Sequence, residues 1–224
     1  MAINAVLVDV DNTLLDFNEA ARVSAIRGFE AFGIDYPQEI FSTFHKVNQQ
    51  LWARIEDGSL QKSELYQMRW NTIFAEHGIS ADGVAFEQLF RQGVAESSVP
   101  MDGALALLAY LKNKYKVCIA SNASYRQQVG RLERAGMLRY VDAFFISEQI
   151  GFPKPQRAFF EACIAGTAAE PARILMIGDS YEADIVGAHA CGIKTCWYNP
   201  QGFPAGSVAP DLTVARLDEI AQYI

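Results

Sequence analysis

The sequence is short of positive charge. Its 19 lysines and arginines face 26 aspartates and glutamates, which gives a net charge of −7. Proteins that bind nucleic-acid polymers or anionic membranes need a basic face, so this balance argues against both kinds of partner. It does not exclude a small anionic substrate, because a binding site needs only local positive charge.

Paired cysteines and long apolar runs are also missing. The four cysteines form no Cys-x-x-Cys motif, so we expect reduced thiols that pack as small apolar side chains. No apolar stretch approaches the roughly 18 residues that span a membrane. The N-terminus has neither the basic region nor the cleavage site of a signal peptide. We therefore expect a cytoplasmic protein.

Length and composition are those of a folded, globular protein. At about 150 residues per domain, the 224 residues predict one large domain or a domain with an insert. Hydrophobic residues make up 50% of the chain and charged residues 20%, a balance that argues against intrinsic disorder.

Short apolar runs recur along the chain and predict a parallel sheet. A run that does not alternate with polar residues is typical of a strand buried on both faces. Such runs lie at 5–10, 116–120, 143–146, 173–177 and 193–197, and helical patterns separate the later ones at 103–114, 124–136, 156–166 and 182–191. This alternation predicts an α/β fold with a doubly wound parallel sheet, a Rossmann-like core.

The segment from residue 16 to residue 96 interrupts the alternation. Apolar residues recur there at helical spacing, for example Ile40, Phe44, Val47 and Leu51, and no strand-like run is present. We therefore predict an all-helical insert over 16–96, placed within a core domain made of 1–15 and 97–224. The candidate substrate contacts in this insert are Phe17, Asn18, Asn48 and Trp52.

Carboxylates gather where the predicted strands end. Ligands of open α/β sheets bind beyond the carboxyl ends of the strands. The polar residues at these ends are Asp9, Asp11, Ser121, Lys154, Asp179 and Asp184. Clustered carboxylates repel each other unless a cation compensates, and oxygen ligands without His or Cys suit Mg²⁺. With a lysine and a hydroxyl for phosphate, these residues indicate metal-assisted phosphoryl transfer with an aspartate nucleophile.

The order and spacing of these residues resemble the haloacid dehalogenase (HAD) superfamily, specifically its phosphatases. Four motifs match: Asp9-x-Asp11-x-Thr13, Ser121, Lys154-Pro155, and Gly178-Asp179-Ser180-x-x-x-Asp184. A single aspartate at a strand end is more often a helix cap or a turn residue, but that explanation does not account for four spaced motifs. The helical insert resembles the superfamily's type-1 cap, so the resemblance covers the whole chain.

The resemblance implies a role for each motif residue. Asp9 is expected to be the nucleophile that forms an aspartyl-phosphate, and Asp11 to protonate the leaving alcohol and then activate water. Lys154 is expected to neutralise the phosphate and orient Asp9. Asp9, Asp179 and the main-chain carbonyl of Asp11 would hold Mg²⁺, with Asp184 stabilising Lys154 or a metal-bound water. Around the phosphate, Thr13 is expected to support the loop after the first strand, Ser121 to donate to a phosphate oxygen, and Asn122 to add a further contact.

Two further stretches bear on the substrate. Residues 47–52 and 127–136 resemble the house-cleaning pyrimidine 5′-nucleotidases, which implies a small phosphorylated partner, a nucleoside 5′-monophosphate. A phosphatase of phosphoglycolate or a sugar phosphate is the alternative. A 2-haloacid dehalogenase fits less well, since it needs neither an acid at Asp11 nor Mg²⁺. A regulatory binding protein on this fold would be expected to lack Asp9 or Asp11. Either a monomer or a dimer is compatible with the sequence.

Overall fold

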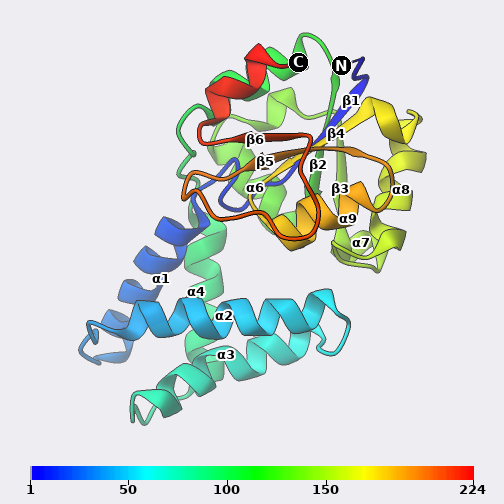
Figure 1. The fold of residues 1–224 in the computed structure, drawn as a ribbon. Helices are drawn as coiled ribbons and strands as arrows, with labels where there is room; N and C mark the ends of the chain where they lie inside the picture. Colours follow the sequence, from blue (N-terminus) through cyan, green and yellow to red (C-terminus); the bar gives the residue numbers. More distant parts are fainter. Residues whose placement is uncertain (1) are drawn as a thin grey trace. The chain divides into compact units, whose positions relative to one another are not determined.

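The computed structural model describes residues 2–224 and divides into two compact units (Figure 1). One unit is Phe17–Ser97, and the other joins the residues up to Asp16 to Ser98–Ile224. The predicted insert, 16–96, begins and ends one residue earlier than the first of these units. Each unit has its own hydrophobic core. No helix within residues 2–224 is both long enough and apolar enough to cross a membrane.

The larger unit is built on a six-stranded sheet in which all neighbouring strands are parallel, in the order β3-β2-β1-β4-β5-β6. The strands are β1 (Ala5–Val8), β2 (Lys116–Ser121), β3 (Ala143–Ile146), β4 (Ile174–Gly178), β5 (Lys194–Tyr198) and β6 (Leu212–Val214). Five of them coincide with the predicted runs, and the predicted doubly wound parallel sheet is confirmed. The sixth, β6, was not predicted, because three residues are too few to carry a pattern.

Helices cover both faces of this sheet. They are α5 (Ala104–Lys112), α6 (Tyr125–Arg134), α7 (Ser147–Ile150), α8 (Arg157–Thr167) and α9 (Gly187–His189), with the 3₁₀ and π-helical turns η1 (Leu138–Tyr140), η2 (Pro171–Arg173), η3 (Tyr181–Val186) and η4 (Leu217–Gln222). The helix predicted over 182–191 is instead the π-helical turn η3 followed by α9. The other three predicted helices of this unit are present, within one or two residues of the predicted bounds at most ends.

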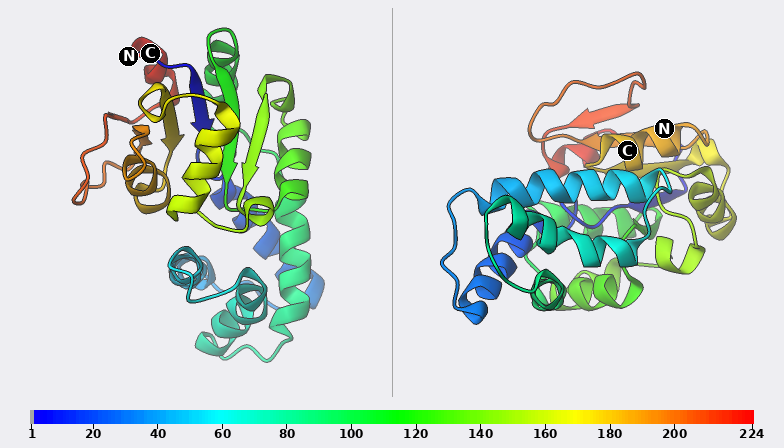
Figure 2. Two further views of the ribbon diagram at one scale, coloured as in Figure 1. Left: turned by 90° about the vertical axis from the view of Figure 1, so that its right-hand side faces the viewer. Right: turned by 90° about the horizontal axis from the view of Figure 1, so that it is seen from below.

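Alternate residues of the central strand point to opposite faces, which explains why β1 is apolar throughout. Val6 and Val8 pack in a core with α5, α6 and η4, whereas Leu7 packs with Phe159 and Phe160 of α8. Figure 2 (left) shows α8 crossing the strands on its face of the sheet. The continuous apolar run of β1 is therefore the sequence signature of a strand covered on both sides.

The strand order places the start of the chain at the middle of the sheet. From β1 the chain adds β2 and β3 on one side and then returns to add β4, β5 and β6 on the other. The reversal lies between β1 and β4, and ligands of open α/β sheets bind beyond the carboxyl ends of the strands at such a point. The residues that follow β1, β2 and β4 are therefore brought to one edge.

The smaller unit contains four helices: α1 (Phe17–Phe32), α2 (Ile40–Glu56), α3 (Lys62–Glu76) and α4 (Gly83–Glu96). Figure 2 (right) shows α2 and α3 lying side by side. The core of the four helices contains a cluster of aromatic rings: Trp70 and Phe86 lie 4.3 Å apart between centroids, and Phe29 and Phe74 pack around them. Gly28 allows α1 to approach closely, since a Cβ there would lie 2.5 Å from Phe86.

A buried ion pair lies inside this aromatic core. Arg69 donates to both carboxylate oxygens of Glu87, at 3.1 and 2.6 Å, and its guanidinium lies over the ring of Phe90. The side-chain oxygen of Asn48 accepts a third hydrogen bond from Arg69, at 2.7 Å. Asn48, a candidate substrate contact in the sequence, is thus engaged inside the helical unit. Trp52 lies under the ammonium of Lys62.

Glu87→Gln is expected to destabilise this unit by about 3 kcal/mol or more, because it leaves the Arg69 charge buried without a balancing carboxylate. The free energy of unfolding can be measured by urea denaturation, followed by tryptophan fluorescence, to which Trp52 and Trp70 of this unit contribute. Glu30→Gln, at an exposed position of α1, is the control and should change stability by less than about 0.5 kcal/mol. A Glu87→Gln protein as stable as this control would show that the ion pair contributes nothing.

Candidate active site

A tight turn follows β1 and presents Asp9 and Asp11. The N–H of Asp9 still bonds to Ile177 of β4 at 2.9 Å, and the carbonyl of Val10 then accepts the N–H groups of the next turn. Asn12 adopts the left-handed conformation with φ of 61°, which asparagine tolerates better than most residues. The chain therefore reverses immediately after the strand and leaves the two aspartates at its carboxyl end.

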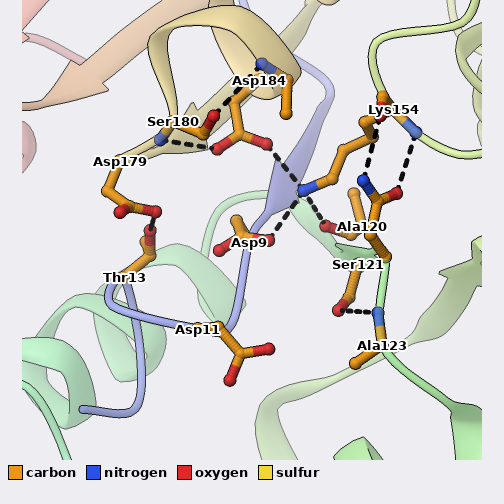
Figure 3. Close-up of polar contacts among 12 residues, drawn as sticks. Asp9, Asp11, Thr13, Ala120, Ser121, Ala123, Lys154, Asp179, Ser180 and Asp184 are labelled. Carbon is orange, nitrogen blue, oxygen red and sulfur yellow. Dashed lines mark hydrogen bonds and ion pairs between the residues drawn. The ribbon is translucent and has the colours of Figure 1, made fainter. Parts of the chain in front are cut away.

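The ammonium group of Lys154 lies at the centre of the site (Figure 3). It donates to Asp9 Oδ1 at 2.7 Å, to Asp184 Oδ1 at 2.6 Å and to the carbonyl of Ala120 at 2.8 Å. A lysine has three N–H donors, and all three are used here. Lys154 is buried, so these contacts hold a full positive charge against Asp9.

Asn122 fixes the backbone of Lys154 from the end of β2. Its side-chain oxygen accepts from the Lys154 N–H at 2.8 Å, and its amide nitrogen donates to the Lys154 carbonyl at 3.0 Å. The oxygen and the nitrogen of the Asn122 side chain are thus both hydrogen-bonded to the backbone of Lys154. The sequence-based expectation that Asn122 contacts phosphate stays a prediction.

Asp179 and Asp184 reach the same place from the end of β4. One carboxylate oxygen from each of Asp9, Asp179 and Asp184 lies within 4.8 Å of the other two. The Thr13 hydroxyl, from the turn after β1, donates to Asp179 Oδ1 at 3.3 Å. Gly178 makes room for this arrangement, because a Cβ there would lie 2.1 Å from the Asp184 carboxylate.

Burial and neighbouring charges shift the pKa values of Asp9, Asp179 and Lys154. Burial, reinforced by the charges of Asp184 and Asp11, raises the pKa of Asp9 to about 7 in spite of Lys154. Burial and the same kind of repulsion raise the pKa of Asp179 well above its usual range. Burial alone would lower the pKa of Lys154, but Asp184 and Asp9 outweigh it and raise that pKa. With all of its carboxylates ionised, the site would carry more negative charge than Lys154 alone can compensate.

This surplus of carboxylate fits a hard divalent cation such as Mg²⁺. Oxygen donors without His or Cys are the ligand set that Mg²⁺ prefers. Both oxygens of Asp184 already accept protein hydrogen bonds, from Lys154 and from the Ser180 N–H at 3.1 Å. Of the two roles expected for Asp184, these contacts favour support of Lys154.

Asp11 lies beside this cluster with its carboxylate pointing away from Asp9 and Lys154 (Figure 3). Its two oxygens accept hydrogen bonds from Gln128 and Arg131 of α6. Ser121 also contacts α6, since its hydroxyl accepts from Gln128 at 3.0 Å. Asp11 is absent from the carboxylate group that could hold a metal, so the expected metal contact rests on its main-chain carbonyl.

Sequence reasoning did not find Gln128, Arg131 or Trp197 as site residues. The indole N–H of Trp197 donates to the Asp179 carbonyl at 2.9 Å and so supports the loop after β4. The available signal was in α6, where two polar residues at i and i+3 occupy the buried side of a helix that packs on a sheet. Polar residues at buried positions of such a helix indicate partners inside the site.

A family model for haloacid dehalogenase-like hydrolases matches residues 3–192 of the chain. The chain belongs to this family. The HAD-hydrolase YfnB of Bacillus subtilis is 32% identical over 218 residues, which cover 96% of this chain and 92% of that protein. The pyrimidine 5′-nucleotidase PynA of Streptococcus pneumoniae is 35% identical over 87% of this chain and 83% of its own, and the pyrimidine 5′-nucleotidase YjjG of Escherichia coli is 31% identical over 98% and 96%.

Solved structures agree with the fold of this HAD hydrolase. The crystal structure of YfnB bound to magnesium superposes with a TM-score of 0.93 at 30% identity, covering 99% of this chain and 98% of that chain. An L-2-haloacid dehalogenase from Xanthobacter autotrophicus superposes with a TM-score of 0.79 at 18% identity, covering 98% and 97%. The second likeness concerns the fold alone. The sequence-based identification of the HAD family is confirmed.

Protons and Mg²⁺ should compete for Asp9. Its pKa of about 7 in the folded protein lies above the roughly 3.9 of an unfolded chain. A carboxyl with a raised folded-state pKa destabilises the fold as it ionises, so metal-free stability should fall as pH rises from about 4 to about 7. Added Mg²⁺ should therefore raise the thermal unfolding temperature more at about pH 8 than at about pH 5.

Thermal unfolding with and without Mg²⁺ across this pH range measures the effect. In Asp9→Asn, the fall in metal-free stability should be smaller and the Mg²⁺ shift should be weakened at every pH. A Mg²⁺ shift in the original protein that does not change with pH would contradict the competition.

Proposed function

We propose that this HAD hydrolase is a Mg²⁺-dependent phosphomonoesterase that hydrolyses nucleoside 5′-monophosphates through an aspartyl-phosphate on Asp9. The observation that carries the proposal is the Lys154 ammonium, buried in contact with Asp9 and Asp184 beside Asp179. A lysine held against the nucleophile supplies positive charge where a phosphoryl group must approach a carboxylate. Without such compensation the two anions would repel each other.

Asp9 and Asp11 divide the first step between them. A carboxylate oxygen of Asp9 attacks phosphorus, the bond from phosphorus to the ester oxygen breaks, and Asp11 donates a proton to the departing alcohol oxygen. Ser121 donates to an oxygen of the transferred group, and the charge of Lys154, whose three N–H donors are already engaged, stabilises that group electrostatically. The leaving alcohol departs neutral, and Asp9 carries the phosphoryl group.

Water completes the reaction in a second step. Asp11, now ionised, takes a proton from a water molecule as its oxygen attacks the phosphorus of the aspartyl-phosphate. The bond from phosphorus to the Asp9 oxygen breaks, which releases inorganic phosphate and restores the carboxylate. Asp11 ends the cycle protonated, as it began.

We assign metal binding to Asp9 and Asp179, together with the main-chain carbonyl of Asp11. Asp184 supports Lys154 instead, since both its carboxylate oxygens are bonded to Lys154 and Ser180. Bound Mg²⁺ would supply charge neutralisation between these carboxylates and the substrate phosphate. The related protein YfnB has been crystallised with magnesium, which supports magnesium as the ion.

The substrate class rests on the relatives. Two of them, PynA and YjjG, are named pyrimidine 5′-nucleotidases and match over most of their length. We propose that the helical unit Phe17–Ser97 is the cap that selects the substrate. The enzyme would act in the cytoplasm on small phosphorylated metabolites. The second candidate is a sugar-phosphate substrate, favoured by a ribulose-1,5-bisphosphate 5-phosphatase from Halopiger xanaduensis at 28% identity.

Asp9→Asn should abolish hydrolysis of every phosphate ester, with a loss of at least about 10⁴-fold in kcat, because it removes the nucleophile. Phosphate release in the presence of Mg²⁺ measures the loss. Asp218→Asn, at an exposed ion pair of η4, is the matched control and should retain full activity. Substantial Mg²⁺-dependent turnover by Asp9→Asn would exclude the aspartyl-phosphate.

A phosphate-release screen tests the substrate. It should include pyrimidine and purine 5′-monophosphates, sugar phosphates and phosphoglycolate, with Asp9→Asn as the blank for contaminating phosphatases. We expect kcat/KM for the best pyrimidine nucleotide to exceed that for sugar phosphates by about tenfold or more. A sugar phosphate as best substrate would favour the second candidate, and halide release from a 2-haloacid without metal would overturn the phosphatase assignment.

A further inference from the structure

Helix α6 places two polar side chains against the site from inside the core. Gln128 and Arg131 lie one turn apart and are both fully buried. Burying an amide and a guanidinium is costly unless both are hydrogen-bonded. A helix that only had to cover the sheet would carry apolar residues at these two positions, so their contacts need a separate explanation.

The two side chains hold the Asp11 carboxylate at two points. Arg131 Nη1 donates to one oxygen, and Gln128 Nε2 donates to the other at 2.7 Å. The Asp11 side chain is 28% exposed, so burial alone does not fix its rotamer. Two donors from one rigid helix therefore set both its position and the plane of its carboxylate.

The same amide group reaches Ser121. Gln128 Nε2 also donates to the Ser121 hydroxyl at 3.0 Å, and the N–H of Ala123 donates to that oxygen at 3.1 Å. A hydroxyl has two acceptor lone pairs and one donor hydrogen. With two donors directed at its oxygen, the Ser121 hydrogen points elsewhere, and Ser121 is prepared to donate to an anion.

Arg131 determines which way the Gln128 amide faces. The Gln128 oxygen accepts from Arg131 Nη1 at 3.2 Å, so the amide nitrogen faces Asp11 and Ser121. The reversed amide would place its oxygen against the Asp11 carboxylate and its N–H groups against the guanidinium. Arg131 thus acts on Asp11 directly and on Ser121 through Gln128.

We propose that Gln128 and Arg131 are positioning residues that set the acid Asp11 and the phosphate-binding hydroxyl of Ser121 as one unit. The inference rests on the proposed function, because it takes Asp11 as the acid and Ser121 as a phosphate contact. Neither residue contacts the reacting atoms. They orient Asp11 and Ser121, so their removal should change two things that can be measured separately: proton donation to the leaving group and binding of phosphate.

Arg131→Met tests the hold on Asp11. An alkyl ester needs a proton on its leaving oxygen, whereas p-nitrophenolate departs without one. We expect the first-turnover phosphorylation rate, measured by quenched flow, to fall by about 10- to 100-fold for the best alkyl ester and by less than about threefold for p-nitrophenyl phosphate. Arg131→Lys, which retains the charge and one donor, should recover part of the alkyl-ester rate.

A double variant shows whether Arg131 acts through Asp11. Asp11→Asn should likewise slow the alkyl ester more than p-nitrophenyl phosphate, and its loss of alkyl-ester rate should be larger than that of Arg131→Met. Adding Arg131→Met to Asp11→Asn should change that discrimination by less than about twofold, because the two residues act on one group. If adding Arg131→Met to Asp11→Asn lowered the alkyl-ester rate again by the full factor seen for Arg131→Met alone, the two residues would act independently and the proposal would be overturned.

Gln128→Met tests the link to Ser121. It removes the donor to both Asp11 and Ser121, so it should slow the alkyl ester more than p-nitrophenyl phosphate. It should also weaken inhibition by inorganic phosphate, by about three- to tenfold. Arg131→Met should weaken phosphate inhibition less than Gln128→Met does. The matched controls on the same helix, Arg126→Met and Gln127→Met, lie outside this network and should leave both measurements unchanged.

The outcomes separate this inference from the proposed function. Failure of the unaltered protein to release phosphate from any ester would overturn both. Normal activity of the unaltered protein, combined with equal losses on both leaving groups in folded Arg131→Met and Gln128→Met, would overturn only the positioning role. Thermal unfolding establishes that each variant is folded, and Arg131→Lys provides the test if Arg131→Met does not fold.

Discussion

The buried ammonium of Lys154 is the contact on which the arrangement of the site depends. It joins the ends of three strands, because Asp9 follows β1, Ala120 belongs to β2 and Asp184 follows β4. A positive charge without carboxylates would be costly at this depth, and the carboxylates without Lys154 would repel one another. Each group is therefore stable there only because the others are present.

This mutual dependence leaves the site with excess negative charge. The pKa of Asp9 and the pKa of Asp179 are both raised, chiefly by burial and then by neighbouring carboxylates. Such a site gains stability by taking up protons or a cation. The same imbalance that destabilises the metal-free protein near neutral pH thus becomes affinity for a divalent ion, and a phosphate can then approach an acidic protein of net charge −7.

Much of the fold and the central part of the site could be predicted from the sequence. The apolar run of β1 ends just before Asp9, and parallel strands place their carboxyl ends at one edge, so Asp9 and Asp179 had to meet there. The helical period of residues 40–55 likewise indicated α2. The short strand β6 and the π-helical turn η3 carried no periodic signal, and both depend on packing against β5 and β4.

The sequence by itself determined which chemical groups are available and at which strand ends they lie, because buried strands need apolar runs and motif spacing fixes the residues that follow them. Only the tertiary structure decided how these groups are shared. It showed Asn122 bonded to the backbone of Lys154, Asp184 bonded to its ammonium, and Asp11 held by Gln128 and Arg131. The physical reason is that a side chain's hydrogen-bond partner depends on its rotamer and on residues distant in the chain, which local pattern does not encode.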